Sequence, residues 1–274
     1  MNPINCPLCK NQLGKVLINY SSPDSYEKAI GVLENNYSRQ WIRCSECGLD
    51  YSRYSRDENL IDEIYKKKYR DLSSNWREEG SHDKFKRIIN LPKNDSETKL
   101  RIEWIKNRLP SASLKKSKKL IDIGGGSGVF AYEFIDSSWE ATLIDLDRTN
   151  VYLDRFHNVN VIRKDFLKEN FKPYYDLATM VFVLEHVKDP LLLLQKAISS
   201  IKEDGHIYIE VPDSLSFKYK PKDDDVFNSC HLTLYSLKTI ENLLYLSNLE
   251  IVDCDQYTTL RNYMSLRVLA KLKN

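Results

Sequence analysis

The stretch LIDIGGGSGVF, residues 120–130, constrains the fold more than any other part of this chain of 274 residues. An apolar run that carries one aspartate leads directly into four glycines within five positions, and apolar residues then return with helical spacing. A strand, a bare turn and a helix in this order are typical of an α/β unit whose turn lets the backbone approach a ligand closely. We therefore expect an α/β domain with a ligand site at this turn.

The residues after 119 alternate between short apolar runs and helical patterns, which indicates a parallel sheet with helices on its faces. The predicted strands lie at 119–123, 141–145, 158–165, 175–183, 205–212, 249–255 and 263–272. Residues 119–274 are thus predicted to form a Rossmann-like, doubly wound, mostly parallel seven-stranded sheet. Ligands of such sheets bind beyond the carboxyl ends of the strands, where the strand order reverses.

The glycine turn matches neither of two common phosphate-binding motifs. A dinucleotide fingerprint has the form G-x-G-x-x-G, and a P-loop requires a lysine after its glycines. Here Asp122, Gly124, Gly126 and Gly128 occupy every second position, and no lysine follows. Such a turn suits the close approach of a flat or extended ligand.

Acidic side chains end the next two predicted strands. Asp145 ends the strand at 141–145 and suits hydrogen bonds from both hydroxyls of a ribose, whereas Asp165 suits an exocyclic amine such as that of adenine. Phe166, beside Asp165, offers a face for stacking. With the glycine turn, these residues predict a site for a nucleoside that carries a charged tail.

Four cysteines form two C-x2-C pairs, Cys6 with Cys9 and Cys44 with Cys47, and 34 residues separate the pairs. Two such pairs can complete a tetrahedral, all-thiolate zinc site, with redox chemistry or unligated thiols as the alternatives. Residues 1–55 contain few large aliphatic side chains, so a metal would supply stability that a core cannot. We interpret them as a small cysteine-rich zinc-binding module.

Residues 56–118 are interpreted as a helical linker and cap. Apolar residues recur with helical spacing at 60–65 and at 100–109, and Asp95 or Ser96 is expected to cap the second helix. Residues 1–119 hold 24 Lys and Arg against 16 Asp and Glu. This excess of positive charge predicts attraction of an anionic substrate, and a merely solvated surface is the equal alternative.

Net charge and the lengths of apolar runs disfavour some classes of protein. The net charge of the chain is only +2, which disfavours a dedicated nucleic-acid binder. The longest apolar runs, such as 180–184, are far shorter than the roughly 20 residues that span a bilayer. The first residues lack the apolar core of a secretory signal. We therefore expect a cytoplasmic protein with no membrane partner.

The phrases IDIGGGSG, LIDLD, VIRKDF, VFVLEHVKDP and IYIEVPD follow one another in this order. Over residues 100–270 the chain resembles class I S-adenosylmethionine-dependent methyltransferases, including the group that contains ubiquinone-type O-methyltransferases. The resemblance implies that the three alternate glycines line the methionine and ribose of S-adenosylmethionine and that Asp122 helps to fix the loop. It also implies that Asp145 holds the ribose and Asp165 the adenine amine.

The cysteine-rich module, combined with the late phrase HLTLYS, is similar to sugar C-methyltransferases that act on nucleotide-linked deoxysugars. In that family the histidine of an E-H-x-x-x-x-S stretch is a candidate catalytic base. The matching residues here are Cys230, His231 and Ser236, so cysteine replaces the family's glutamate, and the family's long C-terminal domain has no counterpart. The resemblance implies a sugar-like substrate between the module and the sheet, and C-methylation is not carried over.

Two histidines are the catalytic candidates, because histidine readily accepts a proton near neutral pH. His231 is the first, with anchoring of its loop as the alternative, and His186 is the second, with shaping of the pocket wall as the alternative. Residues 213–230 are predicted to be a mobile loop over the pocket.

We expect a small anionic acceptor, above all a nucleotide-linked sugar or surface-glycan precursor. The alternative is an RNA base methyltransferase with a zinc knuckle, and a non-enzymatic binding module ranks third.

Overall fold

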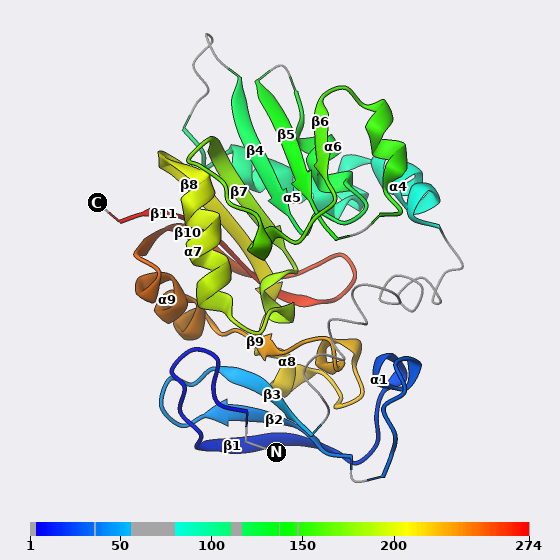
Figure 1. Ribbon diagram of the computed structural model, residues 1–274, viewed down its shortest axis with the longest axis vertical. Coiled ribbons are helices and arrows are strands. Elements are labelled where there is room, and N and C mark those ends of the chain that lie inside the picture. The colour runs from blue at the N-terminus through cyan, green and yellow to red at the C-terminus, as the bar shows by residue number, and fades with distance from the viewer. Residues whose placement is uncertain are drawn as a thin grey trace.

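The computed structural model of the protein describes residues 4–35, 37–55, 80–110, 117–136, 138–146 and 148–273. It contains a large sheet and a small sheet, which Figure 1 shows stacked along the long axis of the molecule. The helix predicted at 60–65 lies outside the described residues. Within the described residues, no helix is long and apolar enough to cross a bilayer.

The large sheet has seven strands in the order β10-β11-β8-β7-β4-β5-β6. Their bounds are β4 Lys118–Ile123, β5 Trp139–Ile144, β6 Val159–Ile162, β7 Tyr175–Val181, β8 Ile201–Pro212, β10 Leu249–Thr258 and β11 Met264–Leu272. The strands from β6 to β8 run parallel, and β11 pairs antiparallel with both β8 and β10. These findings confirm the predicted doubly wound, mostly parallel seven-stranded sheet.

The strand order reverses at β4, because β5 pairs with one of its edges and β7 with the other. The glycine turn at 124–128 follows β4 directly. The predicted ligand turn therefore lies at the carboxyl end of the strand where open α/β sheets bind their ligands.

Helices cover both faces of the large sheet (Figure 1). Their bounds are α4 Ser81–Ile89, α5 Glu97–Lys106, α6 Val129–Phe134, α7 Pro190–Ser200 and α9 Leu237–Leu246. Successive strand residues point to opposite faces, so Leu120 packs in the core that contains Phe134, whereas Ile121 packs with Leu194. Ser96, one of the two predicted caps, accepts a hydrogen bond from the Lys99 amide at the start of α5.

The small sheet has the order β1-β2-β3-β9, and its last strand comes from far along the chain. The bounds are β1 Gly14–Tyr20, β2 Arg39–Cys44, β3 Asp50–Tyr54 and β9 Thr233–Leu234, with helix α1 at Ser25–Ala29. Residue 51 pairs with residue 233. Leu49 and Tyr51 belong to the same buried cluster as Leu194 and Leu243 beneath the large sheet. One core therefore continues from the large sheet into the cysteine-containing module.

The segment 213–230 differs from the predicted mobile loop. It contains the short helix α8 at Ser216–Tyr219 and a single helical turn at Asp225–Phe227. Val226 and Phe227 are buried, and the Phe227 ring lies 6.2 Å from that of Trp41 on β2. Apolar contacts with the module hold this segment in place, and these contacts involve residues nearly two hundred positions apart.

Candidate functional site

The glycine turn requires glycine at several positions. Gly124, Gly126 and Gly128 have φ angles of +68°, +57° and +75°, in the left-handed region that L side chains rarely adopt. A Cβ atom on Gly124 would lie 2.7 Å from a Val183 methyl group, and one on Gly128 would lie 2.3 Å from Leu153. The three glycines therefore permit the backbone conformation of this turn, and Gly124 and Gly128 also permit its close packing.

Asp122 is buried at the carboxyl end of β4, directly beneath the turn. Its Oδ1 accepts a hydrogen bond of 2.8 Å from the Thr179 hydroxyl, whereas its Oδ2 has no hydrogen-bond partner among the described residues. Burial raises the pKa of Asp122 to about 7, and the charge of Asp145 adds to this effect. A Cβ on Gly125 would lie 2.3 Å from Oδ2, so the carboxyl group fits only under a bare backbone.

Asp145 and Asp165 follow adjacent parallel strands, as predicted. The amide of Gly126 donates a 2.8 Å hydrogen bond to Asp145 Oδ2, which places this carboxylate beside the glycine turn. Asp165 caps a short helical turn and accepts a hydrogen bond from the Leu167 amide. The Phe166 ring is buried and stacks on Phe171 with a centroid distance of 5.4 Å. It is thus part of the core rather than the open stacking face that the sequence suggested.

The two candidate histidines lie together, although 44 residues separate them. His186 ends a helical turn after β7, His231 precedes β9, and their ring centroids are 4.9 Å apart. His186 Nδ1 lies 3.0 Å from the Cys230 carbonyl oxygen, and His231 Nδ1 lies 2.7 Å from that of Val226. A carbonyl oxygen only accepts, so both Nδ1 atoms carry the hydrogen, and a neutral ring then has its lone pair on Nε2.

Burial sets the protonation state of both rings. It lowers the pKa of His186 to about 3, with the neighbouring His231 adding to the shift, and it also lowers the pKa of His231. Both imidazoles are therefore neutral at pH 7 and can accept a proton or bind a cation.

Glu185 adjoins this pair and was not singled out as a site residue by sequence reasoning. Its side chain is fully buried, and neither carboxylate oxygen has a hydrogen-bond partner among the described residues. Its Oε1 lies 3.9 Å from His186 Nε2. Burial raises the pKa of Glu185 well above its usual range. The available sequence signal is its position next to His186 in the stretch VFVLEHVKDP.

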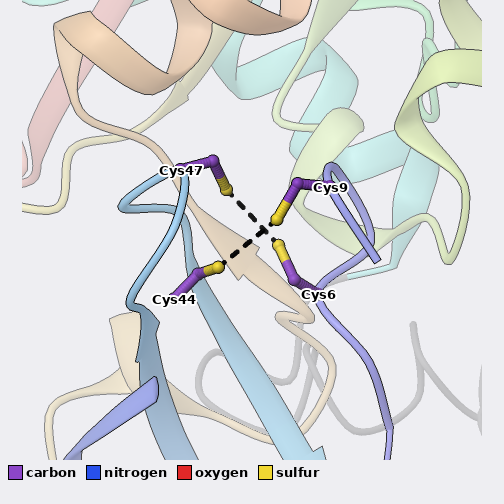
Figure 2. Close-up of side chains that lie close together, drawn as sticks. All are labelled: Cys6, Cys9, Cys44 and Cys47. Atoms are coloured by element: carbon purple, nitrogen blue, oxygen red, sulfur yellow. Dashed lines mark hydrogen bonds between the residues drawn. The ribbon is translucent and has the colours of Figure 1, made fainter. Parts of the chain in front are cut away.

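The four cysteines that the sequence paired also lie together. Cys6 Sγ is 3.5 Å from Cys47 Sγ, and Cys9 Sγ is 3.4 Å from Cys44 Sγ. All four sulfur atoms lie within 4.8 Å of one another, and Figure 2 shows them pointing toward a common centre. Four converging thiols form the donor set of a tetrahedral thiolate site.

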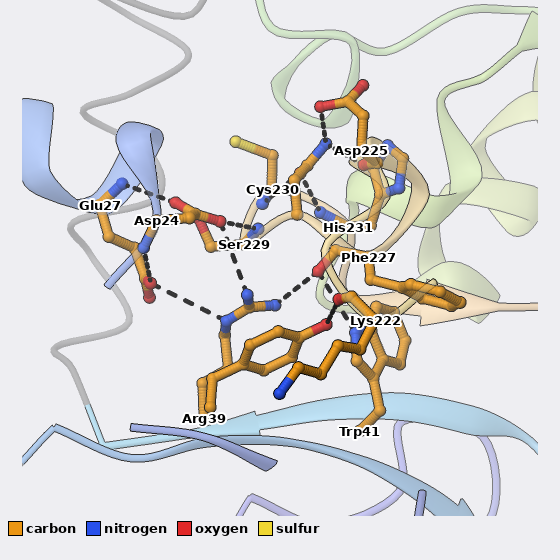
Figure 3. A network of polar contacts seen from close by, with 12 residues as sticks. Asp24, Glu27, Arg39, Trp41, Lys222, Asp225, Phe227, Ser229, Cys230 and His231 are labelled. Atoms are coloured by element: carbon orange, nitrogen blue, oxygen red, sulfur yellow. Dashed lines mark hydrogen bonds and ion pairs between the residues drawn. The ribbon is translucent and has the colours of Figure 1, made fainter. Parts of the chain in front are cut away.

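Arg39 on β2 connects the module to the segment that contains His231 (Figure 3). Its side chain is only 2% exposed. Arg39 donates a 2.7 Å hydrogen bond to the Phe227 carbonyl oxygen. It also forms ion pairs of 3.6 Å with Asp24 and 3.8 Å with Glu27. A buried guanidinium thus links the small sheet to the turn before His231.

Asp24 makes the second connection. Its carboxylate accepts hydrogen bonds from the Ser229 amide at 2.6 Å and the Ser229 hydroxyl at 2.8 Å, and it also caps α1 (Figure 3). The Leu232 amide donates to the Glu185 carbonyl oxygen at 2.7 Å. Residues 229–232 are therefore held by the module on one side and by the turn after β7 on the other. Sequence reasoning missed these links because no local pattern connects residue 24 with residue 229.

Comparison with protein families and curated proteins agrees with this geometry. The family model described as a methyltransferase domain matches residues 96–253. A ubiquinone biosynthesis O-methyltransferase of Vibrio vulnificus is 27% identical over 152 residues, which are 52% of this chain and 59% of that protein. One from Yersinia enterocolitica is 28% identical over 99 residues, 33% of this chain and 41% of that protein. The chain thus spans about half the length of these curated relatives.

Solved structures show the same fold. A 1,6-didemethyltoxoflavin-N1-methyltransferase of Burkholderia thailandensis, solved with 1,6-didemethyltoxoflavin and S-adenosylhomocysteine bound, aligns with a TM-score of 0.60 at 12% identity, covering 89% of this chain and 98% of that one. An S-adenosylmethionine-dependent methyltransferase of Clostridium acetobutylicum aligns with a TM-score of 0.52 at 14% identity, covering 75% and 99%. The family match, the strand order and the glycine turn lead to one conclusion: this chain belongs to the methyltransferase-domain family.

Proposed function

We propose that this protein is an S-adenosylmethionine-dependent methyltransferase and that it methylates a small anionic acceptor, with a nucleotide-linked sugar or surface-glycan precursor as the leading class. The observation that carries the proposal is the pairing of His186 and His231 at 4.9 Å, built from the turn after β7 and from the segment that the module supports. The excess of positive charge in residues 1–119 favours an anion. The names of the curated relatives favour an oxygen atom as the acceptor.

The cofactor contacts form part of the same proposal. Gly124, Gly126 and Gly128 line the methionine and ribose, Asp122 fixes their loop, and Asp145 binds the ribose hydroxyls. The hydrogen bond from Gly126 to Asp145 supports this, because it fixes one carboxylate oxygen beside the turn. Asp165 holds the adenine amine. We keep Phe166 as a contact through its backbone, since its ring is buried.

The sulfonium of the cofactor already activates the methyl group, so the protein's task is alignment of the acceptor and removal of its proton. We propose His231 as the first candidate base and His186 as the second. Burial keeps each ring neutral at pH 7, and each Nδ1 contact with a carbonyl oxygen leaves the lone pair on Nε2.

The four cysteines are proposed to hold a structural Zn²⁺ ion. Their sulfur atoms converge, and none of the six cysteines, all of which lie in the described residues, forms a disulfide. A thiolate site of this kind suits a reducing, cytoplasmic compartment. The ion would stabilise the module on which residues 222–234 rest.

The test is mass spectrometry of the protein incubated with S-adenosylmethionine and two separate pools, one of sugar nucleotides and one of unmodified ribosomal RNA. We expect a mass gain of one methyl group in a sugar nucleotide. A gain confined to RNA would overturn the proposal in favour of an RNA base methyltransferase. Salt separates the two acceptors further, because RNA binding weakens steeply with salt and binding of one small anion does not.

A further inference from the structure

Glu185 poses a problem that the methyl-transfer site does not solve. A buried carboxyl group is costly, whether neutral or charged, unless its oxygen atoms have hydrogen bonds, an ion pair or a metal ion as partners. The Glu185 side chain is fully buried, and both of its oxygen atoms lack a hydrogen-bond partner among the described residues. The Nε2 atom of His186 lies 3.9 Å from Glu185 Oε1. This distance is too long for a direct hydrogen bond.

The two histidines present the complementary donor atoms. Each Nδ1 contacts a backbone carbonyl oxygen, that of Cys230 for His186 and that of Val226 for His231. Metal-binding histidines commonly use one ring nitrogen in this way, and the contact fixes the tautomer and the ring orientation for the other nitrogen. A metal ion would therefore bind through the Nε2 atoms of the two rings.

The three side chains converge. One carboxylate oxygen and one nitrogen from each ring all lie within 4.8 Å of one another. Ligand atoms about 2.1 Å from one ion lie roughly 3 to 3.5 Å apart, so a contraction of the order of 1 Å would bring all three into contact with an ion. The His186 side chain is 14% exposed, which leaves a side open to solvent.

We infer that Glu185, His186 and His231 form a second metal site, for a divalent first-row transition-metal ion with open coordination positions. Two imidazoles and one carboxylate suit zinc, iron, cobalt and their neighbours rather than calcium or magnesium. Ion binding itself does not depend on the proposed function. An ion there would occupy the Nε2 atoms that a general base needs, so ion binding and proton removal by an imidazole are competing states of one site.

The test uses the full chain purified from cells grown with Zn²⁺ or with Co²⁺, with metal counted by mass spectrometry and the cobalt protein examined by absorption spectroscopy. We expect two ions per chain. The thiolate site would give intense thiolate-to-cobalt charge-transfer bands in the near ultraviolet, whereas the second ion would give only weak visible bands. One ion without thiolate bands would support this site and contradict zinc binding by the cysteines. One ion with the thiolate spectrum alone would overturn the inference.

Three variants identify the ligands. Glu185→Gln removes the charge at nearly constant volume, and His231→Asn keeps a donor for the Val226 carbonyl oxygen but removes Nε2. Each is expected to lose the second ion and retain the first. His206→Asn, which changes another buried histidine on β8, should retain both. Persistence of the second ion in both site variants would overturn the inference, and binding of S-adenosylhomocysteine with an unchanged circular dichroism spectrum verifies that each variant is folded.

Discussion

The glycine turn and the junction between module and sheet are specified by the chain in different ways. The turn is built from residues 122–128, which follow one another, and its conformation depends on φ angles that glycine alone adopts easily. The junction joins Asp24 and Arg39 to residues 227 and 229. The residues of the junction come from two distant parts of the chain. The junction therefore forms only when these parts pack together, and we expect it to depend on metal binding by the four cysteines.

The largest expected effect comes from removing the metal ion that we propose for the four cysteines. A structural zinc site contributes of the order of 10 kcal/mol to folding. A strong chelator under reducing conditions is therefore expected to open the module and, with it, residues 226–234. Hydrogen exchange should show loss of protection there and retained protection in β7. Unchanged protection of the small sheet would contradict the dependence of the junction on a metal.

Arg39→Met tests the junction without touching the cysteines. The substitution leaves Asp24 and Glu27 without their buried cation, and breaking a buried ion pair in this way costs about 3–5 kcal/mol. We expect the free energy of unfolding in urea to fall by this amount. Arg261→Met is the control, because Arg261 is 60% exposed and its pair with Glu97 should contribute less than about 1 kcal/mol. Equal losses in the two variants would refute the junction's role.

Gly124→Ala tests the turn. A non-glycine residue at this φ costs about 1–2 kcal/mol, and the new methyl group would also collide with Val183. We expect at least a tenfold weaker affinity for S-adenosylhomocysteine by calorimetry. Gly31→Ala is the matched control, because Gly31 has a φ of +85° and nothing lies within 4 Å of the added atom. If Gly124→Ala binds S-adenosylhomocysteine as tightly as wild type does, the turn does not form part of the cofactor site.

The pH dependence of stability tests Asp122. Its pKa is raised to about 7 in the folded protein, whereas the unfolded value is near 3.8. Between these values the folded state keeps a proton that the unfolded state has lost, so this group makes stability fall as pH rises, by at most about 1.4 kcal/mol per pH unit. Asp122→Asn removes the effect. The free energy of unfolding of Asp122→Asn minus that of wild type should therefore rise from pH 5 to pH 6. If this difference stays constant, the pKa of Asp122 is not raised in the folded protein.

The large sheet could be predicted because a short run of apolar residues indicates each of its strands. The runs 119–123 and 205–212 each correspond to a strand, although β8 begins earlier, at residue 201. The three glycines and Asp145 were predictable for the same reason, since they follow strand ends. Their roles toward the cofactor stay predictions.

The small sheet and its neighbours could not be predicted in this way. β9 has only two residues and is defined by its partner β3 rather than by its own pattern. The buried Glu185 and the support of His231 by Arg39 depend on contacts between distant segments. Nothing in the sequence of segment 213–230, which predicts a mobile loop, indicates that Phe227 packs against Trp41 on β2.

The pairing of residue 51 with residue 233 has a consequence for synthesis on the ribosome. The first three strands of the small sheet emerge early, but the strand that covers the free edge of β3 emerges about 180 residues later. Until then β3 exposes unpaired backbone groups, which are a template for pairing with another nascent chain. Closure of such a distant contact is slow, so chaperones that shield this edge should raise the yield of folded protein more than those that act on the large sheet.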